Sequence, residues 1–442
     1  MGAGDWAPAD PATLRRWHRA ETRLANGSRS SIVYPRYDGN SLPNLASSLV
    51  SAVGLRAGSK PRVSLLPPLA AEIDPAYGRA APGSIVVLLV DGLGWEALRE
   101  LGGVNSHGLP PNWAERATPI TTVFPSTTTC ALTSLSTAQS PSRHGVLGHR
   151  QFLPAWGTVA DLLRMSPVSA PARDTLLPEG VDTSAIRGSP TLFELGLPAT
   201  VLTRSSFEGS GFTRLLYAGA RFRSYMTASD FAEELVAILG RSRPPPIVYA
   251  YWDELDTVLH RRGPSTALAR LELDRLRSLL GVVAARLGTA RSRKTQLWVT
   301  GDHGQAPVDP SRSIAVDRQP ALMALLRHPP TGDRRAAYFS VQHRRTTALV
   351  RELRRILPAG SLIRSFEQVH REGWFGPPPD HPELRARTGD IVVVPSPPVG
   401  FTYQAPSGPT PFHGMRGSHG GLERRELWVP WVAGTLAELS TG

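Results

Sequence analysis

Short apolar runs alternate with amphipathic helical patterns along most of the chain, and this alternation limits the folds that it can adopt. The run IVVLLV at 85–90 precedes the helical pattern WEALRELG; the same alternation recurs as PTLFELG then ATVLT, SDFAEELVAILG then IVYAYW, and TALARLELDRLRSLLGVVAARLG then QLWVTGDHG. Helices that alternate with buried strands predict an α/β fold with a mostly parallel central sheet and helices on both faces. In such a fold, ligands bind outside the carboxyl ends of the strands.

We expect the chain to divide into three parts. Residues 1–80 are polar and rich in Gly and Pro, which favours an N-terminal extension, and residues 81–310 and 400–442 carry the α/β pattern of a core. Residues 311–399 break that rhythm with AAYFSV, TTALVRELRRIL, SLIRSF and GDIVVVP, which predict a small inserted α/β cap. Within the core, we expect Ser229 to cap a helix, and Gly240 and Gly288 to end helices.

Composition narrows the class of protein. The 442 residues carry a net charge of +12, but the basic residues are scattered and only two are lysines, so a nucleic-acid partner is not expected and a small anionic substrate is. No apolar run approaches the ~20 residues of a membrane span, and the N-terminus lacks a secretory apolar stretch, so we expect a soluble cytoplasmic protein. With Cys130 as the single cysteine, a metal must be held by Asp, Glu and His.

Acidic and imidazole side chains follow three of the predicted strands. Asp91 comes directly after IVVLLV, Asp256 and His260 lie four residues apart after IVYAYW, and Asp302 and His303 follow QLWVTG. Because the carboxyl ends of parallel strands meet at one edge, a single crevice could collect them. Taken singly, each has an ordinary alternative: a turn aspartate, two polar residues on one helix face, or an exposed histidine.

Hydroxyl side chains precede a further helical pattern in FPSTTTCALTSLSTA. Apolar residues at 131, 132 and 135 have helical spacing, so a threonine near position 128 would lie at the positive end of a helix. There it could act as a nucleophile if a metal lowered its pKa. The alternative is that Ser126 or Thr127 only caps the helix.

His419, in RGSHGG, completes a set of segments whose order is more informative than any one of them. VDGLG, FPSTTT, TAQSPSRHG, DELDTVLH, GDHG and GSHGG, in that sequence, resemble the alkaline phosphatase superfamily and, within it, the type I phosphodiesterase and nucleotide pyrophosphatase family. The resemblance covers about residues 84–310 and 400–435.

The resemblance implies two divalent metal ions, zinc or alternatively manganese. One would be held by Asp91, Asp302 and His303 and would also contact the nucleophile; the other would be held by Asp256, His260 and His419. The family spacing between the nucleophile, Thr137-Ala138 and His144-Gly145 points to Thr128 as that nucleophile, with Thr127 as the close competitor.

The chain also departs from the family pattern. His149 stands where those enzymes have an asparagine that contacts the phosphoryl oxygen, and His413 is a further candidate for substrate contact. We therefore expect a metal-dependent phosphoester hydrolase, of the phosphodiesterase or nucleotide pyrophosphatase type, that acts through a phosphothreonine. The alternatives are a phosphomonoesterase or phosphomutase on the same core and a non-catalytic metal-binding protein.

Overall fold

The central sheet is the larger organising element of the protein. The computed structural model describes residues 32–55, 64–70, 83–101, 111–177, 182–264, 267–409 and 414–440. Five neighbouring strands of this seven-stranded sheet run parallel. At one side of them two more strands are added, each antiparallel to its inner neighbour. In spatial order the strands are β2 (Thr118–Thr121), β18 (Trp428–Thr435), β9 (Thr295–Thr300), β1 (Ser84–Val90), β8 (Ile247–Trp252), β6 (Ala199–Arg204) and β7 (Arg221–Tyr225).

Helices cover both faces of this sheet, as the alternating pattern predicts. On one face pack α2 (Leu42–Val53), α5 (Thr128–Thr137) and α7 (Gly211–Tyr217). On the other pack α3 (Trp95–Leu101), α4 (Pro111–Arg116), α8 (Ala228–Leu239), α9 (Glu254–Arg262), α10 (Ala267–Leu287) and α17 (Leu436–Ser440). The side chains of β1 alternate between the two hydrophobic cores, because successive residues of a strand point to opposite faces. Among the described residues, no helix combines the length and apolar character that crossing a membrane requires.

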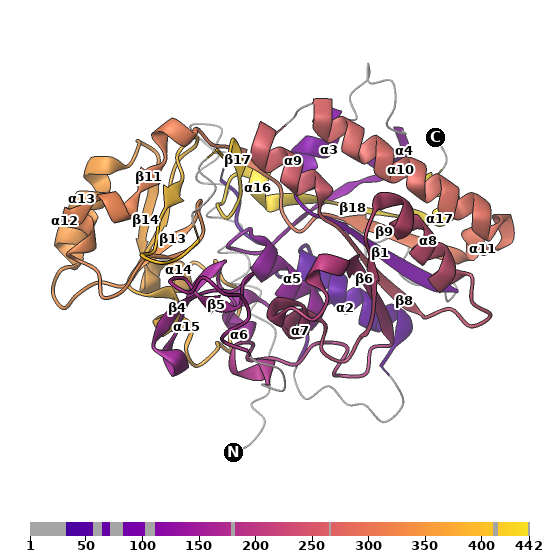
Figure 1. The fold of residues 1–442 in the computed structure, drawn as a ribbon, viewed down its shortest axis with the longest axis horizontal. Coiled ribbons are helices and arrows are strands. Elements are labelled where there is room, and N and C mark those ends of the chain that lie inside the picture. The colour runs from indigo at the N-terminus through magenta and orange to yellow at the C-terminus, as the bar shows by residue number, and fades with distance from the viewer. Residues whose placement is uncertain are drawn as a thin grey trace.

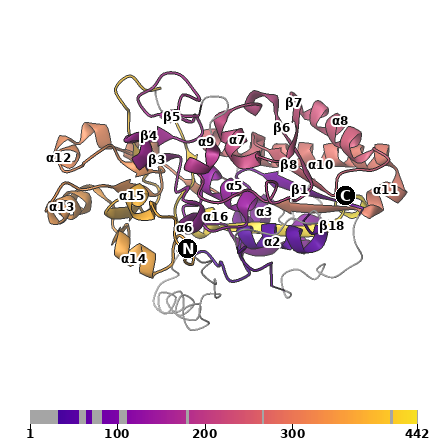
Figure 2. The ribbon, with the colours of Figure 1, turned by 90° about the horizontal axis from the view of Figure 1, so that it is seen from below.

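A second, antiparallel sheet forms the other lobe of the molecule (Figures 1 and 2). Its order is β14 (Leu362–Ser365), β15 (Ile391–Val394), β13 (Ala337–Phe339), β12 (Thr331–Gly332), β3 (Arg150–Leu153), β4 (Thr158–Asp161) and β5 (Ser166–Pro167). The helices of this lobe are α12 (Pro320–Met323), α13 (Thr346–Ile356), α14 (Phe366–Arg371) and α15 (Leu384–Thr388). Two distant segments build the sheet, because the strands at 150–167, which the sequence pattern groups with the core, pair with the insertion through β12 and β3.

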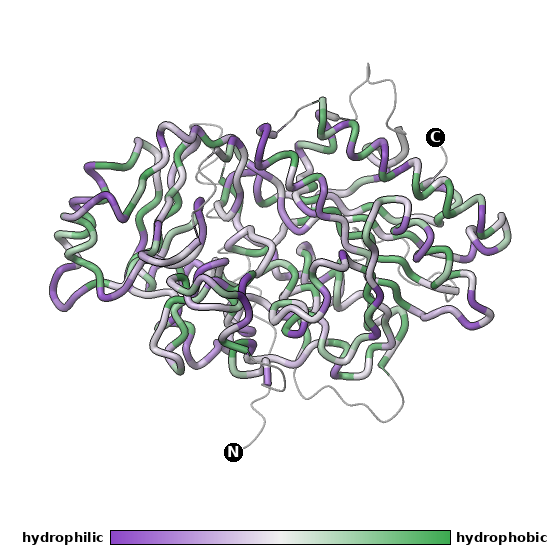
Figure 3. Tube along the Cα trace, viewed as in Figure 1, coloured by the Kyte–Doolittle hydropathy of each residue, from purple (hydrophilic) through white to green (hydrophobic). Residues whose placement is uncertain are grey.

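Two short ladders join residues 306–315 to residues 401–418. β10 (Ala306–Pro307) pairs with β17 (Gly417–Ser418), and β11 (Ile314–Ala315) pairs with β16 (Phe401–Thr402). Three short helices, α6 (Pro141–His144), α11 (Thr289–Lys294) and α16 (Arg424–Leu427), complete the described set. Figure 3 shows apolar stretches running through both lobes, with the strongly hydrophilic ones mostly at the periphery.

Two local expectations are wrong. Residues 191–196 form a series of turns rather than a helix, because the segment between Pro190 and Pro198 is too short to propagate one. The helix α8 is capped by Thr227, whose side chain accepts a hydrogen bond from the Asp230 amide, and not by Ser229. Gly240 and Gly288 do follow the ends of α8 and α10, as expected.

Candidate metal and catalytic site

The carboxyl edge of the central sheet gathers the residues that the sequence singled out. β1 lies between β8 and β9 and runs parallel to both, so the three strands end side by side. Asp91 follows β1 directly, Asp302 and His303 follow β9, and α9, which carries Asp256 and His260, begins just after β8. The parallel sheet therefore delivers residues from three distant segments to one place.

The first group of potential ligands consists of Asp91, Asp302 and His303. One ligand atom of each lies within 4.8 Å of those of the other two. His303 Nε2 is 3.5 Å from Asp91 Oδ1 and 3.4 Å from Asp302 Oδ2, and all three side chains are buried. Two carboxylates and an imidazole this close could hold a divalent cation.

The second group consists of Asp256, His260 and His419, whose ligand atoms also lie within 4.8 Å of one another. One turn of α9 places His260 Nε2 3.1 Å from Asp256 Oδ2. His419 arrives from the segment after β17, and its ring stacks on that of His303 with centroids 3.7 Å apart. The two groups are therefore adjacent.

Backbone carbonyls orient all three histidines in the same way. The Nδ1 atoms of His260, His303 and His419 lie 2.8, 3.1 and 3.2 Å from the carbonyl oxygens of Gly417, Gly304 and Ser126, respectively. An Nδ1–H that donates to a carbonyl leaves the lone pair on Nε2. Each Nε2 is thus available as a ligand. A hydrogen bond from the other ring nitrogen to a carbonyl is the usual support of a metal-binding histidine.

The carboxylates of the first group lack the positive charge that would balance them. Among the described residues, no hydrogen-bond donor satisfies Asp91 Oδ1 or Asp302 Oδ2, although both atoms are buried. Burial raises the pKa of Asp91 well above its usual value, and the charges of Asp302 and Asp256 raise it further. A bound cation removes both penalties, so the residues present fit a metal ion.

The carboxylate of Asp256 is instead stabilised by neighbouring imidazoles and hydrogen-bond donors. Burial acts to raise its pKa, but the charge and hydrogen bond of His260, with help from His303 and Gln305, bring it down to about 2. Gln305 Nε2 donates to Asp256 Oδ1, and the Tyr251 hydroxyl donates to Asp91 Oδ2. Sequence reasoning missed both Gln305 and Tyr251, since neither type of side chain is a usual ligand and only their contacts with the carboxylates reveal them.

Thr128 lies at the start of α5, against the first ligand group. Its Oγ1 is 3.1 Å from His303 Nε2, and it keeps 8% of its surface exposed while Thr127 and Thr129 are fully buried. Neither of the candidate caps closes the helix with its side chain: the Ser126 hydroxyl donates to the Gly421 carbonyl, and Thr127 makes no capping bond. The hydroxyl of Thr127 points elsewhere, 3.3 Å from His149 Nε2.

His149 lies next to the ligand groups and is paired with an acid from the second lobe. Its Nδ1 is 2.9 Å from Asp333 Oδ1, and Asp333 belongs to the turn between β12 and β13. Burial lowers the pKa of His149, but the Asp333 charge and hydrogen bond outweigh that effect and raise it. No sequence signal marked Asp333, because its role depends on a contact between two lobes. His413, the other predicted substrate contact, lies outside the described residues.

Glycines permit the close packing of the ligand-bearing loops. Gly92 has φ +76, and a Cβ there would lie 3.0 Å from the Cα of Asp256. A Cβ on Gly304, next to His303, would lie 2.0 Å from the Arg425 carbonyl oxygen. These glycines let the loops after β1 and β9 approach their neighbours closely enough to bring the ligands together.

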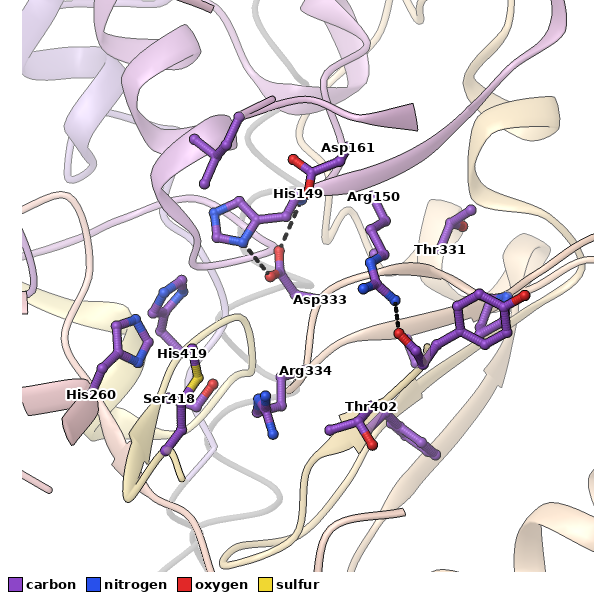
Figure 4. A pocket seen from close by; sticks show the side chains of 17 residues that line it. His149, Arg150, Asp161, His260, Thr331, Asp333, Arg334, Thr402, Ser418 and His419 are labelled. Atoms are coloured by element: carbon purple, nitrogen blue, oxygen red, sulfur yellow. Dashed lines mark hydrogen bonds and ion pairs between the residues drawn. The ribbon is translucent and has the colours of Figure 1, made fainter. Parts of the chain in front are cut away.

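A pocket of about 210 Å³ opens beside the second ligand group and extends between the lobes (Figure 4). His260 and His419 line it at one end, with His149 and Asp333 beside them. Residues of the second lobe and its approaches complete the wall: Arg150, Asp161, Leu163, Pro330, Thr331, Gly332, Arg334, Ala337, Phe401, Thr402, Tyr403, Met415 and Ser418. The pocket gives a small molecule access to His260 and His419 of the second ligand group.

A mostly parallel sheet with two adjacent acid and imidazole groups at its carboxyl edge, facing a threonine at a helix start, defines a hydrolase of the alkaline phosphatase superfamily. Residues 85–421 match the family model of type I phosphodiesterase/nucleotide pyrophosphatase. The chain belongs to that family and is an enzyme that hydrolyses phosphoric ester bonds. No curated protein sequence matches it significantly.

Solved structures of low sequence identity share the fold. Murine ectonucleotide pyrophosphatase/phosphodiesterase 5 superposes with a TM-score of 0.57 at 16% identity, over 79% of this chain and 87% of the murine one. An inactive threonine-to-alanine variant of that enzyme, in complex with AMP, gives the same values. Phosphonoacetate hydrolase from Sinorhizobium meliloti 1021, in complex with phosphonoformate, has a TM-score of 0.56 at 18% identity, over 80% of this chain and 90% of that one.

Proposed function

We propose that the protein is a two-metal phosphoester hydrolase in which Thr128 is the nucleophile. The observation that carries the proposal is the position of the Thr128 hydroxyl, 3.1 Å from a histidine of one three-residue ligand group and beside a second such group. Three carboxylates and three imidazoles suit zinc, and manganese fits the same ligands. When bound, the two cations would supply positive charge to the reacting phosphoryl group and to the attacking and leaving oxygens.

The chain itself positions the reacting groups. Thr128 Oγ1 would attack phosphorus in line, forming an oxygen–phosphorus bond as the bond to the leaving alcohol breaks. The hydroxyl proton of Thr128 ends, in net terms, on that alcohol. Water then cleaves the phosphothreonine and restores the hydroxyl. The N-terminus of α5 would favour the phosphoryl charge, because the unpaired amide groups of a helix N-terminus carry partial positive charge. His149, whose pKa is raised by the charge of Asp333, would donate to a phosphoryl oxygen.

The identity of the nucleophile is tested by a matched pair of variants. Thr128→Ala should lower the turnover of a chromogenic phosphodiester by about a thousandfold or more in zinc-loaded protein, whereas Thr127→Ala should retain most of it. Rapid acid quenching followed by mass spectrometry should find the phosphoryl group on residue 128 of the wild type. A phosphoryl group on residue 127, or full activity of Thr128→Ala, would overturn this assignment.

Monoester hydrolysis or phosphoryl transfer is the second candidate. It is supported by the small size of the pocket. Rates with a diester and with a monoester of the same alcohol, measured on one metal-loaded sample, separate the two activities. A metal-binding protein without activity would contain stoichiometric metal and form no phosphothreonine.

We also propose that the insertion at 311–399 selects the substrate, since residues from it line the pocket opposite the ligand groups. The cytoplasmic location expected from the sequence stays a prediction, which cell fractionation would check.

A further inference from the structure

The pocket has a basic end that the proposed chemistry does not use. Arg150, the first residue of β3, and Arg334, in the turn between β12 and β13, both line it. Figure 4 shows Arg334 between the ligand histidines and Arg150, with Arg150 on the side of the second lobe. Two arginine side chains thus line the pocket between the candidate metal site and the second lobe.

Arg150 is partly buried and forms no ion pair with a described residue, although the charges of Asp161 and Asp333 act on it. Its Nη1 donates to the carbonyl oxygen of Tyr403 at 2.9 Å, and its guanidinium lies 5.7 Å from the centroid of the Tyr403 ring. Among the described residues, no carboxylate lies within ion-pair distance of Arg150; its cross-strand neighbour Asp161 instead accepts a hydrogen bond from the Arg164 amide. A cation held away from water is costly unless an anion compensates it.

Arg334 is held in place by the packing of its stem. A Cβ added to Gly400 would lie 2.6 Å from its Cγ, so the absent side chain of Gly400 makes room for it. The next residue along the turn anchors the backbone, because Arg335 pairs with Glu426 at 3.1 Å in the interior. Burial lowers the pKa of Arg334 to about 10, and the charge of Arg150 adds to this effect.

The remaining lining of this end suits a compact polar anion. Thr331 and Thr402 add hydroxyl groups, and Tyr403 adds an aromatic ring under Arg150. Guanidinium groups bind carboxylates and phosphates through paired hydrogen bonds, more strongly when the site is partly dehydrated.

We propose that Arg150 and Arg334 form a subsite for a second anionic group, a carboxylate or a phosphate, on the part of the substrate that is not transferred. This inference rests on the proposed function, because it places the transferred phosphoryl group at the ligand histidines. It narrows the substrate class to phosphoesters with at least two separated anionic groups.

The test measures binding of three matched phosphonates to zinc-loaded wild-type protein by calorimetry. Propylphosphonate has no second charge, 3-phosphonopropionate carries a carboxylate in place of its methyl group, and 1,2-ethanediphosphonate carries a second phosphonate there. We expect at least one charged ligand to bind about ten- to hundredfold more tightly than propylphosphonate. The better of the two identifies the anionic group.

Variants assign that preference to the arginines. The relevant ratio is the dissociation constant of propylphosphonate divided by that of the better charged phosphonate. Arg150→Met and Arg334→Met should each reduce this ratio to below about threefold. Arg355→Met, a change at an exposed arginine of α13, should keep the wild-type ratio. A ratio near one in the wild type, or a ratio retained in both variants, would overturn the subsite. If the zinc-loaded wild-type protein prefers a charged phosphonate but hydrolyses no phosphoester, the result contradicts the proposed function and not the subsite.

Discussion

The rings of His303 and His419 stack with their centroids 3.7 Å apart and their planes 18° from parallel. His303 belongs to the group with Asp91 and Asp302, and His419 to the group with Asp256 and His260. The contact therefore joins the two ligand groups into one site. A substitution in one group should lower the metal content but leave the ligands of the other group in place.

Replacing one ligand should remove one metal ion. Asp256→Ala leaves Asp91, Asp302 and His303 in place, so we expect the zinc content to fall from two ions per chain to one. Phosphoester turnover should fall at least a hundredfold, because both ions take part in the chemistry. Metal analysis by mass spectrometry measures the first effect. Asp274→Ala, on α10, is the matched control and should bind two ions; unchanged zinc in Asp256→Ala would contradict the ligand assignment.

Asp333 should act through His149. Asp333→Asn removes the charge that raises the pKa of His149, and we expect kcat/KM to fall about ten- to hundredfold while the zinc content is unchanged. His149→Gln should cause a similar loss. Because the two residues form one unit, the double variant should lose little more than either single variant. Losses that multiply in the double variant would show that the two residues act independently.

The buried ion pair of Arg335 and Glu426 should contribute to stability. Both side chains are fully buried, and Arg335 also donates to the carbonyl oxygens of Pro395 and Val399 at 2.7 and 2.8 Å. Arg335→Met leaves the Glu426 carboxylate buried without its cation, so the free energy of unfolding should fall by about 3–5 kcal/mol. Urea unfolding measures this change.

An exposed ion pair provides the control for that experiment. Arg355→Met breaks the contact with Glu352 on the surface of α13 and should cost less than about 1 kcal/mol. If the free energy of unfolding falls equally in the two variants, the buried ion pair contributes no more to stability than the exposed one.

Acid should destabilise the protein through His381. Burial and the charge of Arg387 lower the pKa of this histidine to about 4, against about 6.5 when unfolded. Between these values the unfolded chain binds more protons, so this contribution is complete above pH 6.5 and is lost as the pH falls toward 4. The melting temperature of His381→Gln should therefore decrease less between pH 7 and 5 than that of the wild type. An identical decrease would contradict this origin.

Four strands of the central sheet, β1, β6, β8 and β9, and the residues that follow three of them could be predicted from the sequence. Asp91, Asp256 and Asp302 were placed at the carboxyl ends of β1, β8 and β9 because strand periodicity and the i, i+4 spacing of a helix turn are local properties. The same locality explains two errors. A short apolar segment at 191–196 resembles a helix, and Ser229 resembles a cap, until neighbouring residues decide otherwise.

Only the tertiary structure decided what depends on contacts between distant segments. The pairing of β3 with β12 carries residues 150–167 into the second sheet and brings Asp333 to His149, and no local pattern encodes that pairing. The adjacent threonines at 127 and 128 have nearly the same sequence context, yet the start of α5 directs one hydroxyl toward His149 and the other toward His303. Local periodicity thus determined which ligand types were available and in what order. Long-range packing determined which of them meet, because the distance between two side chains depends on all the chain that folds between them.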